Sequence, residues 1–388
     1  MNLTADLGLS YYQTYSAKFS CPLCVNGHCM IDIAPNKGSP AISRTDVNDA
    51  PIRVVRYERV AHETQWDVFI ERSMNGTAFH RQQFLRYHPE GRFDFHHLLF
   101  FEGPRLVAVL PGGLRDGASM TDHARVFESP LGASYGSFVT EDISAQTALD
   151  IVAAFERYIR AQGIEEVYLT SAPVIYQPLL TQNLEFALLY RGYAYQRHYI
   201  SHAIDLRHPG TPFDRFQSAA RKHIRRVTRE NPSVWIEESQ PESLREMLLE
   251  FYPILLENKA KYHATPTHTL EDLFRLQELL PDFMKLFLVR VGEEPVAGSL
   301  LFLANDRVAL IFYHMLRYAF DSLKPIYLLM DNVTRWAKEE GYHFVDIGVS
   351  QDTSDENPMT PALSLIHFKE KFDSRGVLRS TLHKSYHG

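Results

Sequence analysis

The stretch that decides the fold is Pro325–Ile347, PIYLLMDNVTRWAKEEGYHFVDI. Pro325 is typical of the first turn of a helix, and Gly341 is typical of the residue just after a helix ends. Apolar side chains recur between them at the spacing of one helix face, at Ile326, Met330, Val333 and Ala337. Phe344–Ile347 is a short apolar run, which predicts a buried strand. The stretch therefore predicts a helix that is followed by a strand.

The same pattern occurs once more, 178 residues earlier in the chain. The offset of 178 relates Gly163 to Gly341, Phe155 to Val333, and Val167 to Val345, and an offset of 179 relates Tyr193 to Phe372. One offset that holds through helix, glycine and strand predicts a structural duplication. The alternative is coincidence, because helix–glycine–strand units are common in α/β proteins.

The flanking patterns predict the rest of each half. Apolar runs on either side of turns predict hairpins at 95–110 and 285–303, and Val308–Met315 extends the second one. We therefore predict an α/β (α+β) fold of two tandem mixed-sheet domains, residues 51–206 and 207–388. The second contains an all-helical insertion at 211–280. Residues 1–50 have no sustained period and are rich in Asn, Asp, Ser, Gly and Pro, which predicts a flexible extension.

The composition is that of a soluble globular protein, with 388 residues and a net charge of −7. The acidic balance argues against a protein that coats nucleic acid, and we expect no DNA partner, although a local basic patch can still bind phosphates. No run reaches the length of a membrane span, and the first residues lack the basic segment of a signal peptide. We expect a cytoplasmic protein.

Cysteine usage allows one candidate metal site. Cys21, Cys24, His28 and Cys29 supply four possible zinc ligands within nine residues. Structural zinc sites usually spread their ligand pairs over a longer loop, so a reduced, flexible tail is the alternative. We predict no metal in the folded part of the chain.

The segment 211–230 predicts a strongly basic helix. Thr211 and Pro212 are typical of a helix start. Its apolar face comprises Phe213, Phe216, Ala220, Ile224 and Val227. Cations form two columns at i,i+4 spacing, Arg221–Arg225–Arg229 and Lys222–Arg226. Such columns fit the phosphates of tRNA or coenzyme A, while a solvated face balanced by nearby acids is the alternative.

Lys369 is predicted to lie among apolar side chains. Thr360 and Pro361 are typical of a helix start, and the helix is predicted to continue to Phe372. At 100° per residue, Lys369 falls within the face formed by Ala362, Leu365, Phe368 and Phe372. A lysine in that position either extends its ammonium to solvent or meets a buried partner. A buried ammonium could stabilise an oxyanion, or act as a base with a lowered pKa.

One further motif bears on catalysis. Gly132–Gly136 (GASYG) matches the G-x-S-x-G pattern of a hydrolase with Ser134 as nucleophile. That pattern requires a strand before the serine and a helix after it, and the following residues look extended, so a glycine-rich loop is the preferred interpretation.

Taken together, the chain resembles the GNAT superfamily of acyltransferases, in the double-domain form of the FemAB-like peptidyltransferases. The resemblance covers about residues 52–386. It depends on the order of these segments: Trp66–His80, Leu106–Pro111, Gly132–Gly136, His263–Leu270, Val296–Gly298, Asp346–Ser350 (DIGVS) and Phe368–Phe372 (FKEKF). The family has a glycine where this chain has Asp373.

The resemblance implies acyl transfer to an amine, from acyl-CoA or aminoacyl-tRNA as a dissociable donor. It places the Phe368–Lys369 pair at the active centre. Enzymes of the superfamily that use coenzyme A hold its pyrophosphate on a glycine-rich turn at a helix start. The corresponding segment here, Leu316–Pro325 (LRYAFDSLKP), has no glycine, although Arg317 and Lys324 could contact phosphate. The missing glycines weaken the case for coenzyme A and make an aminoacyl-tRNA donor more plausible, which suits the basic helix.

These observations give a specific site hypothesis. Lys369 stabilises the oxyanion, and Asp346, at a predicted strand end, is the base or an orienting group. Phe368, Tyr313 and Ser350 line the pocket. Arg221, Lys222 and Arg225 hold phosphates of the donor or an anionic acceptor. The acceptor is a small-molecule or peptide amine. Two alternatives are a non-catalytic binding module on the same scaffold and a serine hydrolase that uses Ser134.

Overall fold

The computed structural model describes residues 52–116, 125–261, 263–352 and 355–386. They belong to one compact unit, Ala50–Gly388. The predicted N-terminal extension and the Cys21–Cys29 cluster lie outside the described residues.

The strands form two sheets, and the fold is mixed α/β as predicted. The smaller sheet has the order β1 (Arg53–Arg56), β3 (Leu98–Glu102), β4 (Arg105–Leu110), β7 (Val139–Thr140). The larger has the order β10 (Val234–Glu238), β11 (Met284–Val291), β12 (Glu294–Leu303), β13 (Val308–Leu316), β14 (Phe344–Val349), β9 (Ala194–Asp205), β15 (Ser374–Ser385), β8 (Glu166–Thr170), β6 (Arg125–Ser129), β5 (Gly113–Asp116), β2 (Asp94–Phe95).

Helices connect and cover these strands. The α-helices are α1 (Arg59–Arg72), α2 (Gln82–Leu85), α3 (Ala145–Ala161), α4 (Asn183–Tyr190), α5 (Pro212–Arg215), α6 (Ser218–Glu230), α7 (Leu244–Lys261), α8 (Leu270–Leu279), α9 (Pro325–Glu339) and α10 (Leu363–Glu370). The 3₁₀ helices are η1 (Ala78–His80), η2 (Val174–Tyr176) and η3 (Tyr318–Leu323). Among the described residues, no helix combines the length and the hydropathy needed to cross a bilayer.

The two halves repeat one unit, as the offset predicts. In the first half, α3 connects β6 to β8, which pair in parallel. In the second, α9 connects β13 to β14, which also pair in parallel. Gly163 (φ +63°) and Gly341 (φ +86°) follow the two helices in the left-handed conformation that glycine adopts without steric cost.

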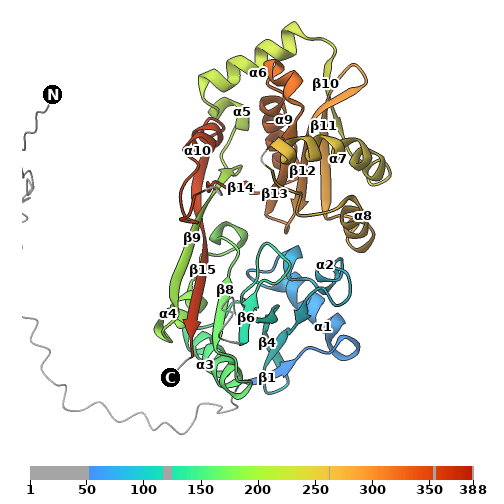
Figure 1. The fold of residues 1–388 in the computed structure, drawn as a ribbon. Helices are drawn as coiled ribbons and strands as arrows, with labels where there is room; N and C mark the ends of the chain where they lie inside the picture. The colour runs from blue at the N-terminus through green and yellow to red at the C-terminus, as the bar shows by residue number, and fades with distance from the viewer. Residues whose placement is uncertain (1–51, 117–124, 262, 353–354, 387–388) are drawn as a thin grey trace, which may run out of the picture. The chain divides into compact units, whose positions relative to one another are not determined.

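The halves exchange their last strands. β9 ends the first half but pairs with β14 of the second, and β15 ends the second half but pairs with β8 of the first. The two strands also pair with each other from Ser374 to His383, and they run side by side between the halves (Figure 1). The larger sheet is therefore continuous across the duplication.

The second half buries both faces of its sheet. α7 and α8 pack on one face of the sheet, over Phe302 of β12 and Tyr313 of β13. Phe79 and Phe84 of the first half belong to the same hydrophobic cluster. α6 and α9 cover the other face, over Leu301 and Ile311. Side chains that alternate along β13 therefore enter two different environments.

Several local predictions were wrong. The stretch 211–280 is not all helical, because β10 lies within it and pairs with β11 at the sheet edge. The basic helix is two helices, since Phe216 (ψ +148°) and Gln217 (ψ +147°) are extended and separate α5 from α6. Helix α10 starts at Leu363 rather than at Thr360, because Ala362 has a non-helical ψ of +82°.

Candidate active site

β13 and β14 pair over a short distance and then separate. Their register runs from Val308–Phe344 to Leu310–Asp346, although β13 continues to Leu316 and β14 to Val349. An irregularity between Asp346 and Val349 also shifts the register with β9, and Gly348 there has φ +76°. The carboxyl ends of parallel strands are where α/β sheets commonly bind ligands.

Lys369 lies at this point of separation. It is 3% exposed, and among the described side chains of α10 it alone is buried. Its Nζ donates hydrogen bonds to the carbonyl oxygens of Gly348 (2.7 Å) and Val349 (3.0 Å) and to Oγ of Ser350 (2.9 Å). A helix lysine thus bonds the carbonyls at the end of β14, beyond the point where β13 stops pairing with it.

The surroundings of Lys369 favour its uncharged form. Burial lowers the pKa of Lys369 to about 8, while the charge of Asp346 acts in the opposite direction. The pKa of His314 falls to about 4, mainly through burial and also through the charge of Lys369. A cation, a carboxylate and a neutral imidazole therefore influence one another across the separated strands.

Asp346 lies inside β14 rather than at its end, and it is fully buried. One carboxylate oxygen accepts hydrogen bonds from Ser201 (2.6 Å) and the Gly348 amide (2.8 Å). The other accepts from Tyr176 (2.9 Å) and Tyr135 (3.3 Å). Four donors occupy the acceptor sites of a carboxylate, so this geometry suits a group that orients its neighbours better than a free base.

The other predicted pocket residues separate into two groups. Ser350 is fully buried beside Lys369, and Phe368 packs on Tyr327 at a ring distance of 5.6 Å. Tyr313 lies on the opposite face of the sheet, in the core under α7 and α8, where its hydroxyl contacts Nδ1 of His268 at 3.0 Å. The structure therefore does not bring Tyr313 together with Lys369.

His314 is the residue that the sequence analysis missed. It follows Tyr313 in β13 and pairs with Ser299, whose hydroxyl contacts its Nδ1 atom, so it faces the side of α9. Its Nε2 atom is buried, and a backbone hydrogen bond with Ile326 is one of the influences on its pKa. The alternation of side chains along β13 would have suggested His314 if the register had been known.

The two cation columns of α6 have different surroundings. Arg221 donates to the carbonyl of Asp214 at 2.7 Å, and the Arg225 guanidinium lies 5.2 Å from the Phe213 ring centre, so both contact the α5 segment. Lys222 and Arg226 lie on the side of His223, whose ring is 5.3 Å from that of Tyr327 in the first turn of α9.

A basic cluster surrounds the start of α9. Burial, and then the charges of four cations, lower the pKa of His223; the cations are Arg226, Lys324, Lys371 and Lys222. These four residues are the α9 basic cluster. Because a helix start also carries partial positive charge, an anion is favoured at this place.

Two non-glycine residues near the site have left-handed backbone conformations. Lys324 precedes α9 with φ +51°, and Asp373 follows Phe372 with φ +59°. Asp373 is held by Arg215 (2.8 Å) and Arg375 (2.9 Å). The chain therefore makes both turns without glycine.

Ser134 lacks the setting of a hydrolase nucleophile. It lies in a bend between β6 and β7, with no helix after it, and its carbonyl accepts a hydrogen bond from Arg379 at 2.6 Å. The loop around Ser134 lies in the part of the chain that the structure describes, and it lacks the strand–turn–helix arrangement that defines a nucleophile elbow.

Comparison with known proteins identifies the fold. Residues 215–357 match the family model "Acetyltransferase (GNAT) domain". The crystal structure of FemX superposes with a TM-score of 0.61 at 10% identity, covering 86% of this chain and 97% of FemX. The chain has the GNAT-superfamily, FemAB-like fold. No curated protein sequence matches it.

Two further solved structures share this FemAB-like fold. The C-terminal domain of a putative lysylphosphatidylglycerol synthetase from Agrobacterium fabrum superposes with a TM-score of 0.54 at 13% identity, covering 85% of this chain and 93% of that domain. The lysylphosphatidylglycerol synthetase structure (L-PGS) from Bacillus licheniformis gives 0.53 at 13%, covering 84% and 92%. At such identities the likeness concerns the fold. The GNAT family match ends before Lys369, so the role of this lysine depends on its own geometry.

Proposed function

We propose that the protein transfers an acyl or aminoacyl group from a phosphate-bearing donor to an amine, at the place where β13 and β14 separate. The observation that carries the proposal is the buried ammonium of Lys369 at the open end of β14. The GNAT match to the second half supports the class of reaction.

Lys369 would stabilise the oxygen that becomes anionic. The amine nitrogen bonds to the acyl carbon, and the carbonyl oxygen gains negative charge before the bond to the donor sulfur or oxygen breaks. All three N–H groups of Lys369 already have acceptors. The oxyanion must therefore replace one of them, and the hydroxyl of Ser350 can rotate away more easily than a backbone carbonyl can move. A preorganised donor of this kind typically contributes about 3 kcal/mol to transition-state stabilisation.

A proton must pass from the amine to the leaving group. His314 is neutral near pH 7, because burial lowers its pKa to about 4. We assign His314 the acceptance of a hydrogen bond from the amine. Asp346 then acts as the positioning residue for the end of β14, through its bond to the Gly348 amide.

The α9 basic cluster would hold the donor. Lys222, Arg226, Lys324 and Lys371 lie around His223 at the start of a 15-residue helix, so the chain supplies charge where a glycine turn is missing. Both acyl-CoA and aminoacyl-tRNA carry phosphates that such a cluster can bind. This makes the second half the donor half.

A binding module without catalysis is the second candidate. It is favoured by the three intramolecular hydrogen bonds of Lys369, which fully satisfy the ammonium without a substrate. It predicts that donors bind but that no acyl group is transferred.

The test offers each donor in turn. The full chain is incubated with acetyl-CoA and, separately, with charged tRNA, in the presence of a mixture of amines, and mass spectrometry follows loss of donor and gain of product. We expect one donor to be consumed with an equal amount of amide formed. Donor binding without any consumption would refute acyl transfer and leave the binding module.

A further inference from the structure

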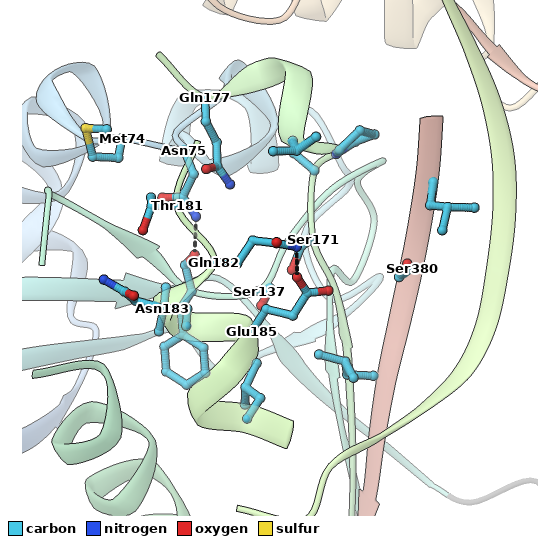
Figure 2. Close-up of a pocket in the computed structure, with 18 of the residues that line it drawn as sticks. Met74, Asn75, Ser137, Ser171, Gln177, Thr181, Gln182, Asn183, Glu185 and Ser380 are labelled. Carbon is cyan, nitrogen blue, oxygen red and sulfur yellow. Dashed lines mark hydrogen bonds between the residues drawn. The ribbon is translucent and has the colours of Figure 1, made fainter. Parts of the chain in front are cut away.

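The first half contains a cavity of about 520 Å³ that the proposed chemistry does not use. Its walls come from the segment after η2, from α4, from the segment before β7 and from β15. Figure 2 shows polar side chains gathered around this space, among them Asn75, Gln177, Gln182 and Glu185. Small-molecule sites typically have volumes of about 300–1,000 Å³, so the cavity is large enough for a ligand.

The cavity is the first-half counterpart of the site at Lys369. It lies beyond the parallel pairing of β6 with β8, where Ser137 and Ser171 line it next to the isolated parallel bridge between Gly136 and Ser171. α4 covers it through Leu188, just as α10 covers the second-half site through Lys369. The duplication has therefore produced two clefts, and the first has no lysine.

The two sites differ most in charge. The described residues that line the cavity include no lysine and no arginine, whereas the α9 basic cluster has four cations. Its two carboxylates are Glu141, which pairs with Arg72 at 3.0 Å, and Glu185, which has no ion pair with a described residue. A phosphate or carboxylate ligand would meet repulsion here, while a cation would be attracted.

Glu185 is held in place but keeps acceptor capacity. It accepts hydrogen bonds from the hydroxyl of Tyr195 and the amide of Gln182, one on each carboxylate oxygen. Burial, followed by the hydrogen bond and the charge of Glu185, raises the pKa of Tyr195 to about 12. Since a carboxylate offers about four acceptor positions, two remain for a ligand.

Uncharged polar groups complete the wall. Asn183 donates its side-chain nitrogen to the carbonyl of Ile143 at 2.8 Å, which leaves its Oδ1 atom as an acceptor. Gln182 likewise keeps its Oε1 atom, and Ser171 is an exposed hydroxyl at the rim. Acceptors of this kind match a ligand that carries several hydroxyl groups.

The cavity wall lies close to Ser350 through the exchanged strands. Leu378 of β15 lines the cavity and is paired with Ile200 of β9, whose carbonyl accepts a hydrogen bond from the Ser350 amide at 2.9 Å. Leu378 in the cavity wall and Ser350, which accepts a hydrogen bond from Lys369, are therefore two strand spacings of about 4.8 Å apart.

We propose that this cavity binds an amino sugar without a phosphate group, with the ammonium at Glu185 and the hydroxyl groups at Gln182, Asn183 and Ser171. Its binding stands independently of the function proposed above, because an ammonium held at Glu185 is not the amine that reacts beside His314 and Lys369.

The test measures binding without any donor. Calorimetry compares glucosamine, glucose, glucosamine 6-phosphate and hexylamine on the full chain. We expect glucosamine to bind at least tenfold more tightly than the other three, because only it combines an ammonium, hydroxyl groups and no anion. Glu185→Gln should reduce the affinity for glucosamine to the affinity for glucose. Ser171→Trp, at the exposed rim, should abolish the binding of both sugars.

Controls separate the two proposals. Glu339→Gln changes an exposed carboxylate on α9 and should leave binding unchanged. Lys369→Met should keep glucosamine binding even if it stops transfer. Absence of glucosamine binding, equal binding of hexylamine or glucosamine 6-phosphate, or full binding by Glu185→Gln would each overturn the amino-sugar site, whatever the outcome of the transfer assay.

Discussion

The Nζ atom of Lys369 donates to the Oγ atom of Ser350 at 2.9 Å, and both residues are buried. The bond joins helix α10 to the chain just after β14, at the place where β13 no longer pairs. Ser350 also contacts Nδ1 of His202 at 3.3 Å. The hydroxyl is thus the one side-chain acceptor of an ammonium whose other acceptors are backbone carbonyls, and it marks where a substrate oxygen can enter.

Replacement of Lys369 tests the oxyanion role. We expect Lys369→Met to reduce turnover by a factor of about 10²–10³, the usual effect of removing one oxyanion donor. The measurement is turnover with the donor that the transfer assay identifies, next to a thermal melt. His367→Ala, an exposed change on the same helix, is the control and should keep full activity. Turnover within a few-fold of the parent in a folded Lys369→Met protein would contradict the assignment.

The pH dependence of turnover follows from the same residue. The pKa of Lys369 is about 8, so its ammonium loses its proton as the pH rises through that value. If the charged form stabilises the oxyanion, turnover at saturating substrates should fall above about pH 8. The residual activity of Lys369→Met should lack this fall. A rate that rises steadily through pH 9 in the parent would instead indicate that Lys369 acts as a base.

The two columns of α6 should behave differently toward the donor. Lys222→Ala with Arg226→Ala removes half of the α9 basic cluster, so we expect weaker donor binding and a shallower dependence of affinity on salt. Arg221→Ala with Arg225→Ala is the matched pair, and its effect should be smaller, because these arginines contact Asp214 and Phe213. Titrations at several salt concentrations measure both. Equal slopes for the two double variants would remove the assignment of phosphate to the cluster.

Buried histidines should make the fold sensitive to acid. Burial lowers the pKa of His80 to about 4 and that of His97 to about 3. The unfolded chain takes up protons near pH 6.5 and the folded chain does not, so stability is complete above about pH 6.5 and decreases as the pH falls toward 4. Each histidine accounts for at least about 2 kcal/mol of this change. Urea unfolding at pH 7.5 and pH 5 measures it, and His97→Gln should show a smaller difference. Equal midpoints in the parent would disprove the prediction.

Asp346 is predicted to stabilise the fold rather than to accept the proton. Asn in its place keeps one acceptor oxygen for four donors, so Asp346→Asn should lose about 2–4 kcal/mol of unfolding free energy. Asp306→Asn, at the exposed turn between β12 and β13, should change stability little. Chemical denaturation gives the comparison. Full stability combined with a complete loss of turnover would restore Asp346 as the base.

Local patterns predicted most of the elements, because periodicity and turn residues act over a few positions. The helix–glycine–strand units and the meander of the second half occur as expected. The errors also have local causes. β10 is short and lies at the edge of the sheet, and its sequence neighbours are helices.

The site could be predicted only in part. The burial of Lys369 followed from its position among apolar neighbours, although Leu365 of the same face is 39% exposed. Its partners did not follow, since Gly348, Val349 and Ser350 lie about 20 residues away and are brought to it by the end of strand pairing. The placement of Tyr313 failed for a related reason. β13 has a bulge between Ile311, the partner of Leu301, and Tyr313, the partner of Leu300. This bulge determines which side chains of β13 face α9.

The sequence by itself determined the duplicated α/β units, the basic character of α6 and the presence of a lysine among apolar residues, because each of these depends on spacing along one segment. Only the tertiary structure decided that β9 and β15 change halves, that His314 rather than Tyr313 faces Lys369, and that the first-half cavity is free of cations. Strand exchange and register join residues more than a hundred positions apart, and no local period carries that information.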